Sequence, residues 1–527
     1  MSYLKFDKTV MINLEESLTR EVLRTNRTGA YHCTTVVDCN TRKYHGLLVM
    51  PVPEIDDDNH VLLSSLDETV IQHGAEFNLG LHKYQGDNFS PKGHKYIREY
   101  SSDTVPRTLY RVGGVIFSKE KVFSLYENRI MIKYTLEDAH SATTLRFRPF
   151  LAFRSVKSLT QANGNVNQSY TEVPNGIKTC MYHGYPELYM QFNKKVKFVY
   201  EPYWYNGIEY PKEQERGYPY KEDLYVPGYF EIPIKKGESI IFSAGDSPVA
   251  TTRLKSLYEN EVNARTPRTS FFNCLKNSAQ QFYFRPKEDD AYLLAGYPWF
   301  KVRARDLFVA LPGCTLSIAD PVRFEKIMHT AMPAIRAYMT EYKKDSVIRE
   351  IDEPDVFLWA IWAIQQYAKE AGVERAKELY AEFVNEILEF ISGQKHPDMK
   401  VMENGLVFAN GRDKAITWMN STINGKPVVP RSGYIVEFNA LWYNALCFYT
   451  ELTGGIPIEK YDKLIKAMDT SFQDTFVNGY NYLFDSVNGS IVDWSVRPNM
   501  IFAVSLPYSP LTRVQKRSVV DIVTKEC

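Results

Sequence analysis

The spacing of apolar residues changes along this chain, and that change constrains the fold more than any other feature. In the second half, two helical patterns alternate. One has a single apolar stripe, as in residues 324–339, 376–391 and 461–472, whereas the other, in Val356–Tyr367 and Phe438–Tyr449, is apolar nearly all round. A helix with one apolar stripe lies at a surface, and one that is apolar on every side is buried. Strict alternation therefore predicts inner helices joined to outer ones, as in an α/α barrel.

The first half has a different pattern, with short alternating or β-branched segments between Gly, Asn, Asp and Pro turns. This pattern is typical of an antiparallel β-sandwich. The expected strands are Tyr31–Val37, His45–Val52, Val115–Phe123, Arg129–Leu136, Leu188–Phe192, Phe230–Pro233 and Ser239–Ala244. The charged stretch Thr251–Pro267 is the expected boundary. We therefore predict a β-sandwich domain over residues 1–255 and a helical-barrel domain over 265–527.

Composition excludes several classes of function. The 63 basic residues balance the 63 acidic ones, so nothing favours nucleic acid or an anionic membrane as a partner. Seven scattered cysteines are typical of reduced thiols, and we find neither a signal peptide nor an apolar run long enough for a bilayer, which together predict a cytoplasmic protein. Because metal-ligand spacings and phosphate-binding glycine motifs are absent, we expect no metal and no cofactor.

Three carboxylates precede predicted inner helices. Asp306 precedes Leu307–Leu311, and Asp355 and Glu437 precede the two segments that are apolar all round. Because inner helices of an α/α barrel run parallel, we expect these carboxylates to meet at one rim as catalytic groups. Capping and the helix dipole also favour Asp and Glu in a first turn, so a purely structural role is the alternative.

Aromatic and arginine side chains accompany these carboxylates. Aromatic faces stack on sugar rings, and acidic groups act on glycosidic bonds, so the combination predicts a carbohydrate enzyme. The aromatic content of 14% suits this interpretation, although large cores explain it equally well. The expected substrate-binding residues are Trp299, Phe300, Arg305, Trp359, Trp418, Arg431 and Trp442.

Several motifs resemble a known family. They are Gly296-Tyr297-Pro298-Trp299-Phe300 with Arg305-Asp306, Asp355 with Leu358-Trp359, Thr417-Trp418-Met419, Pro430-Arg431, and Glu437 with Asn439-Ala440-Leu441-Trp442. These segments resemble the bacterial and archaeal glycogen-debranching amylo-α-1,6-glucosidases, and Asn40–Leu48 resembles their β-sandwich. The resemblance implies hydrolysis of the α-1,6-linked glucose left at branch points of glycogen or limit dextrin, with inversion by an acid and a base.

The chain departs from that family in two respects. Asn420 stands where the family commonly has the Asp that looks like its general acid, so Asp306, Asp355 or Glu437 would have to take that role. The segment that carries the family's general base is not found, and about nine of the twelve helices of such a barrel can be counted. We therefore expect a barrel that is incomplete at its carboxyl end, with the general base beyond residue 527. A catalytically impaired glycan-binding protein and another α/α-barrel α-glucosidase remain as alternatives.

Overall fold

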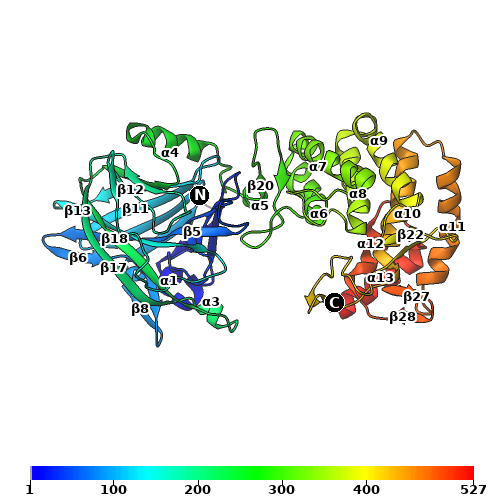
Figure 1. Ribbon diagram of the computed structural model, residues 1–527, viewed down its shortest axis with the longest axis horizontal. Coiled ribbons are helices and arrows are strands. Elements are labelled where there is room, and N and C mark those ends of the chain that lie inside the picture. The colour runs from blue at the N-terminus through cyan, green and yellow to red at the C-terminus, as the bar shows by residue number, and fades with distance from the viewer. Residues whose placement is uncertain (1–2) are drawn as a thin grey trace. The chain divides into compact units, whose positions relative to one another are not determined.

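The computed structural model describes residues 3–527, which form two compact units divided between Glu288 and Asp289 (Figure 1). This division lies later than the predicted boundary. Helices α4 (Leu254–Asn263) and α5 (Phe271–Gln280) both belong to the first unit, although we expected α5 to open the helical domain. A tertiary contact ties α5 to the first unit: the side chain of Gln281, at the end of α5, accepts a hydrogen bond from the backbone nitrogen of Thr25 (2.9 Å).

Two antiparallel sheets make up most of the first unit, and every predicted strand is confirmed. The strands of the nine-stranded sheet are, in order, β1 (Lys5–Asp7), β9 (Ile97–Ser102), β10 (Pro106–Val112), β11 (Val115–Phe123), β12 (Arg129–Asp138), β19 (Ser239–Gly245), β16 (Leu188–Phe192), β15 (Gly176–Thr179) and β14 (Thr171–Val173). The eight-stranded sheet has the order β17 (Lys197–Glu209), β18 (Lys221–Ile234), β13 (Thr143–Ser155), β5 (Asn59–Gln72), β4 (Gly46–Pro51), β3 (Tyr31–Thr35) and β2 (Glu21–Thr25), with β6 (Ala75–Asn78) beside β5. Apolar residues of both sheets form one continuous core.

Shorter elements complete the first unit. They are α1 (Lys8–Ile12), α2 (Leu14–Ser17), α3 (Pro211–Gln214), β7 (His82–Tyr84), β8 (Asn88–Ser90) and β20 (Tyr283–Phe284). Helices α1 and α2 are capped by the side chains of Asp7 and Asn13, which accept from backbone N–H groups of the first turn.

The second unit is mainly helical. Its helices are α6 (Ala304–Cys314), α7 (Pro321–Glu341), α8 (Pro354–Ala371), α9 (Val373–Ser392), α10 (Val436–Leu452), α11 (Glu459–Phe476), α12 (Phe502–Ser505) and α13 (Arg513–Glu526). The predicted alternation is confirmed, because α8 and α10 are buried on nearly all sides whereas α7, α9 and α11 each bury one face. The predicted inner helix near residue 499 is a 3-10 turn (Pro498–Ile501) that continues into the short α12.

Loops between these helices carry a small antiparallel sheet that the sequence did not predict. Its order is β22 (Met399–Val401), β23 (Val407–Ala409), β26 (Gly433–Ile435), β27 (Ser486–Asn488) and β28 (Ile491–Asp493), and the unit also contains β21 (Tyr292–Leu293), β24 (Thr422–Ile423) and β25 (Lys426–Pro427). Strand β26 runs directly into α10, so this sheet fixes the loops next to the start of a buried helix.

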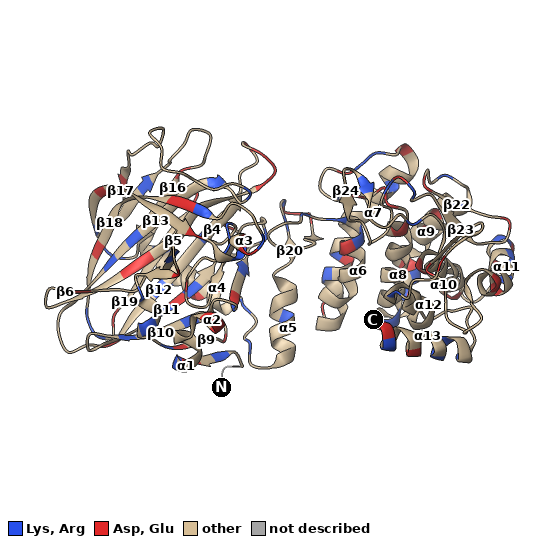
Figure 2. Ribbon diagram, turned by 90° about the horizontal axis from the view of Figure 1, so that it is seen from below, with Lys and Arg blue, Asp and Glu red and all other residues tan. Residues whose placement is uncertain are grey.

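Acidic and basic residues are interspersed along both units (Figure 2), in keeping with the equal numbers of the two charges. Within residues 3–527, no helix is both long and apolar enough to cross a membrane.

Candidate active site

A buried ion pair joins the first turns of α6 and α8. Arg305 donates through Nε to Asp355 Oδ2 (2.7 Å) and through Nη2 to Asp355 Oδ1 (2.8 Å), and it also contacts Glu353. One turn along α8, Trp359 donates through Nε1 to Asp355 Oδ2 (3.3 Å). The first turns of α6 and α8 therefore lie side by side.

One guanidinium serves two carboxylates at this point. Burial, together with the neighbouring Asp355, raises the pKa of Glu353 to about 7, although Arg305 opposes the shift. In turn, the two carboxylates raise the pKa of Arg305 despite its burial. Arg305 therefore stays charged, and Glu353 is the group of this cluster that takes up a proton near neutral pH.

Because the pKa of Glu353 is higher in the folded chain than its ordinary value of 4.5, its contribution to stability is largest below pH 4.5 and is lost as the pH rises towards 7. Relative to a Glu353→Gln variant, the free energy of unfolding of the wild type should fall by on the order of 2 kcal/mol between pH 4.5 and 8. Denaturant unfolding at several pH values measures this difference. Glu374→Gln, at an exposed position on α9, should keep the wild-type profile, and parallel profiles for wild type and Glu353→Gln would contradict the assignment.

A second buried cluster surrounds Arg431, just before β26. Arg431 binds both carboxylate oxygens of Glu437, with Nη2 2.7 Å from Oε2, and its Nε donates to Asp485 Oδ2 (2.8 Å). The three side chains are each at most 2% exposed. Burial raises the pKa of Glu437 in spite of Arg431. With both oxygens bound by a buried cation and a side chain that is 2% exposed, Glu437 anchors the loop that carries Arg431.

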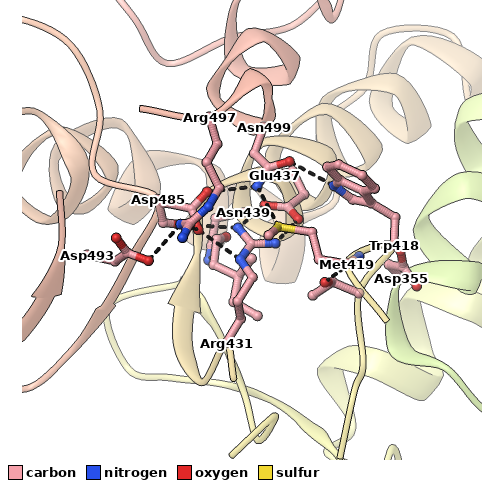
Figure 3. Close-up of polar contacts among 12 residues, drawn as sticks. Asp355, Trp418, Met419, Arg431, Glu437, Asn439, Asp485, Asp493, Arg497 and Asn499 are labelled. Carbon is pink, nitrogen blue, oxygen red and sulfur yellow. Dashed lines mark hydrogen bonds and ion pairs between the residues drawn. The ribbon is translucent and has the colours of Figure 1, made fainter. Parts of the chain in front are cut away.

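A chain of hydrogen bonds leads from this cluster to an exposed tryptophan (Figure 3). Asn499 Nδ2 donates to Asp485 Oδ1 (2.7 Å), and Trp418 Nε1 donates to Asn499 Oδ1 (2.7 Å). On its other side, Asp485 accepts from Arg497 (2.7 Å), which also pairs with Asp493 (2.6 Å). Trp418 is 49% exposed, so the buried network fixes the indole N–H of a side chain that remains about half exposed.

The small sheet explains why these distant residues meet. Ile435 pairs with Ser486 across the antiparallel strands β26 and β27. The residue after Ile435 and the residue before Ser486 are therefore neighbours. The backbone nitrogen of Val436 donates to Asp485 O (3.1 Å), which places Asp485 beside the first turn of α10. Arg431, which lies just before β26, reaches both Asp485 and Glu437.

A cavity of about 460 Å³ lies against these clusters. It is lined by Leu294, Ala295, Arg305, Asp306, Val309, Ala310, Trp359, Trp418, Pro498, Asn499 and Phe502. Asp306 is the one carboxylate among the described lining residues. Burial raises its pKa, opposed by Arg303 and Arg305, and its contact with Arg303 is long (3.7 Å) because Glu350 holds that guanidinium at 2.6 Å.

The structure corrects the predicted roles of two residues. Trp442 is completely buried and donates through Nε1 to Gly405 O (3.2 Å), so it has no face for a sugar. Arg431 is 2% exposed and binds Glu437 and Asp485, so its guanidinium holds the loop and is not presented at the surface. The predicted Trp299 and Phe300 are exposed (59% and 47%) in the loop before α6, but neither lines the cavity.

Among the predicted residues, Arg305, Asp306, Trp359 and Trp418 do meet at the cavity. Asn420 is partly exposed in the same loop as Trp418 and is not a lining residue. The structural alternative fits part of this arrangement: Asp306, Asp355 and Glu437 all lie in the first turns of α6, α8 and α10, and Asp355 and Glu437 are held in buried ion pairs, although none of the three is an N-cap residue.

Sequence reasoning missed Glu353, Asp485, Asn499 and Phe502. A signal existed for the first two, since an arginine next to a buried apolar helix needs a compensating carboxylate. Nothing in the sequence pattern marks Asn499 or Phe502.

Two family models match this chain. Residues 20–241 match the N-terminal model of the glycogen debranching enzyme, and residues 276–527 match Amylo-alpha-1,6-glucosidase. The chain belongs to the glycogen debranching enzyme family. Within this family member, the second model covers both arginine clusters and the whole cavity, so the candidate site lies in the glucosidase part of the chain.

Other comparisons are weaker. No curated protein matches the sequence. A bacterial glucoamylase complexed with acarbose aligns over 94% of this chain and 72% of its own, at 10% identity and a TM-score of 0.43. The family GH92 α-mannosidase BT3965 from Bacteroides thetaiotaomicron aligns over 86% and 61%, at 10% identity and a TM-score of 0.29. TM-scores of this size establish no common fold for this member of the debranching family.

Proposed function

We propose that this chain hydrolyses α-1,6-linked glucose at branch points of glycogen or a related branched α-glucan, at the cavity of the second unit. The observation that carries the proposal is the placing of Asp306 in a cavity that Trp359 and Trp418 also line. Tryptophan faces stack on sugar rings, and a carboxyl group beside them serves the glycosidic bond. We further propose that the alternating helices are those of an α/α barrel, with the cavity at the rim where its inner helices begin.

The contacts in the two arginine clusters suggest different roles for the three carboxylates. Asp355 and Glu437 are each held through both oxygens, which fixes the first turns of α8 and α10. Asp306 retains an exposed side chain (46%) and a raised pKa, the condition that suits a carboxylic acid for donating its proton to a leaving oxygen. Val309, Ala310 and Phe502 line the same cavity as Asp306 and give it an apolar surface. We therefore assign Asp306 the acid role.

Asn420 favours a second candidate function, a glycan-binding protein without full acid/base chemistry. Because a carboxamide donates no proton at neutral pH, this position cannot supply the acid that the family resemblance implies. Release of glucose from a branched limit dextrin separates the two functions. The proposed glucosidase releases glucose from limit dextrin and not from a linear maltooligosaccharide, whereas a binding protein is retained on glycogen and releases none from either.

Asn420 also gives a mutational test of the acid assignment. Since Asn420 is not among the residues that line the cavity, Asn420→Asp should leave the rate of glucose release from limit dextrin within about 3-fold of wild type, well below the roughly 10²-fold scale of an acid group. A rise of about 10-fold or more would place the acid at residue 420 and would remove Asp306 from that role.

A further inference from the structure

The first unit contains a cavity of about 420 Å³ that the proposed glucosidase reaction does not use. It lies where β1 and β2, edge strands of the two sheets, approach helix α5. Three arginines line it. Arg20 pairs with Glu16, whereas Arg24 on β2 and Arg268 just before α5 come from different elements and do not. Among the other lining residues are Phe6, Tyr100, Ser102 and Gln281.

Neither Arg24 nor Arg268 has a carboxylate partner among the described residues. Arg24 donates to Leu23 O (2.6 Å) and to Ser102 Oγ (2.9 Å). Arg268, which is 5% exposed, donates through Nη2 to Asn277 Oδ1, and its buried Nη1 has no hydrogen-bond partner. Both arginines are therefore cations held largely by neutral groups, an arrangement that costs free energy until an anion arrives.

Other charges at this cavity are already paired. Glu21 is bound by Arg42 (2.6 Å) and lies 3.5 Å from His45. Arg20 pairs with Glu16, and its guanidinium stacks 4.5 Å from the centre of the Phe6 ring. Glu21 thus does not neutralise Arg24 or Arg268, which leaves the cavity with a net excess of positive charge.

The ionisation of Arg24 and Arg268 agrees with this geometry. Burial, with a contribution from nearby Arg268, lowers the pKa of Arg24 to about 9, and burial lowers the pKa of Arg268 as well. Both shifts have the sign expected for buried cations that lack an anion, opposite to the shifts of Arg305 and Arg431 beside their carboxylates.

We propose that this cavity binds a phosphomonoester of a small sugar. Paired guanidinium groups present forked N–H donors that match the oxygens of a phosphate dianion, which can neutralise both cations at once. A volume of about 420 Å³ is larger than a phosphate group needs and lies in the range of small-molecule sites, roughly 300–1,000 Å³. The side chains of Phe6 and Tyr100, whose rings are nearly parallel (centroids 6.0 Å apart), add apolar surface beside the arginines, with the Arg20 guanidinium over the Phe6 ring.

Calorimetric titration of the full chain tests the proposal, with glucose 6-phosphate as the ligand and inorganic phosphate and glucose for comparison. Glucose 6-phosphate should bind with a Kd below about 1 mM, and inorganic phosphate should compete with it. Arg268→Gln and Arg24→Gln should each weaken binding by at least about 10-fold, since each removes a charge-assisted contact. Arg111→Gln removes a charge at an exposed position of the same unit and should leave the affinity unchanged.

Two results would overturn this inference. One is the absence of saturable binding of glucose 6-phosphate to the wild-type chain. The other is undiminished affinity in a folded Arg268→Gln or Arg24→Gln variant, which would place the phosphate elsewhere; the two substitutions lie on separate elements, so either variant suffices if the other does not fold. Glucose release from limit dextrin should be the same in all these variants, so the outcome is independent of the proposed reaction.

Discussion

Asp306→Asn should lower the rate of glucose release from limit dextrin by at least about 10²-fold while the chain remains folded and is retained on glycogen. The substitution removes the carboxyl proton at the cavity and preserves the size of the side chain. Asp306 has only a long contact to Arg303, so its loss breaks no close ion pair. A single-turnover assay measures the effect on the chemical step.

Asp474→Asn is the matched control, because Asp474 is an exposed carboxylate on α11 in the same unit. It should keep the wild-type rate. If Asp306→Asn retained a rate within about 3-fold of wild type, the acid role would belong to another group, since acid groups typically contribute 10²–10⁴-fold.

Arg431→Met should destabilise the second unit by about 3–5 kcal/mol, because it leaves Glu437 and part of Asp485 as buried charges without their cation. For a unit of this size, that change corresponds to a fall of about 10 °C in the thermal midpoint. Calorimetry or circular dichroism measures the midpoint. This effect differs from that of Asp306→Asn. The Asp306 variant should slow the chemical step in a folded chain, whereas Arg431→Met should lower the stability of the fold.

Arg412→Met provides the comparison for this variant. Arg412 lies in the loop between β23 and β24 and is exposed, so its replacement should leave the midpoint nearly unchanged. Equal midpoints for Arg431→Met and the wild type would mean that the buried ion pairs contribute little to stability, contrary to the role assigned to them here.

The periodicity of the hydrophobic residues predicted the helices and strands well. It predicted their grouping into two domains less well. The alternation of α8 and α10 with amphipathic helices follows directly from residue spacing. Helix α5 (Phe271–Gln280) falls within the predicted helical domain over 265–527, but its amphipathic stripe does not identify what it will cover. Gln281 hydrogen-bonds to Thr25, more than 250 residues earlier, and only the folded chain shows such a contact.

The candidate site divides in the same way. The sequence identified Arg305, Asp355, Arg431 and Glu437 as candidate site residues. It could not show that Arg305 pairs with Asp355 and Arg431 with Glu437. Arg305 and Asp355 lie 50 residues apart, and ion pairs use the same residue types as acid/base catalysis. Trp359 and Trp442 show a related limit. Both occupy buried helices, and the rotation of each helix decides that one lines the cavity and the other packs against the loop at Gly405.

The most direct test of the proposed function is the anomeric form of newly released glucose. Proton NMR can follow the first minutes of reaction between the chain and a limit dextrin that carries single α-1,6-linked glucose residues. The proposal predicts that β-glucose appears first, as inversion at the anomeric carbon requires, and that this signal is lost in Asp306→Asn. Release of α-glucose would contradict the inverting mechanism. No glucose at all from a folded chain that is retained on glycogen would contradict the hydrolase and favour the glycan-binding protein, which lacks the general base that inversion requires.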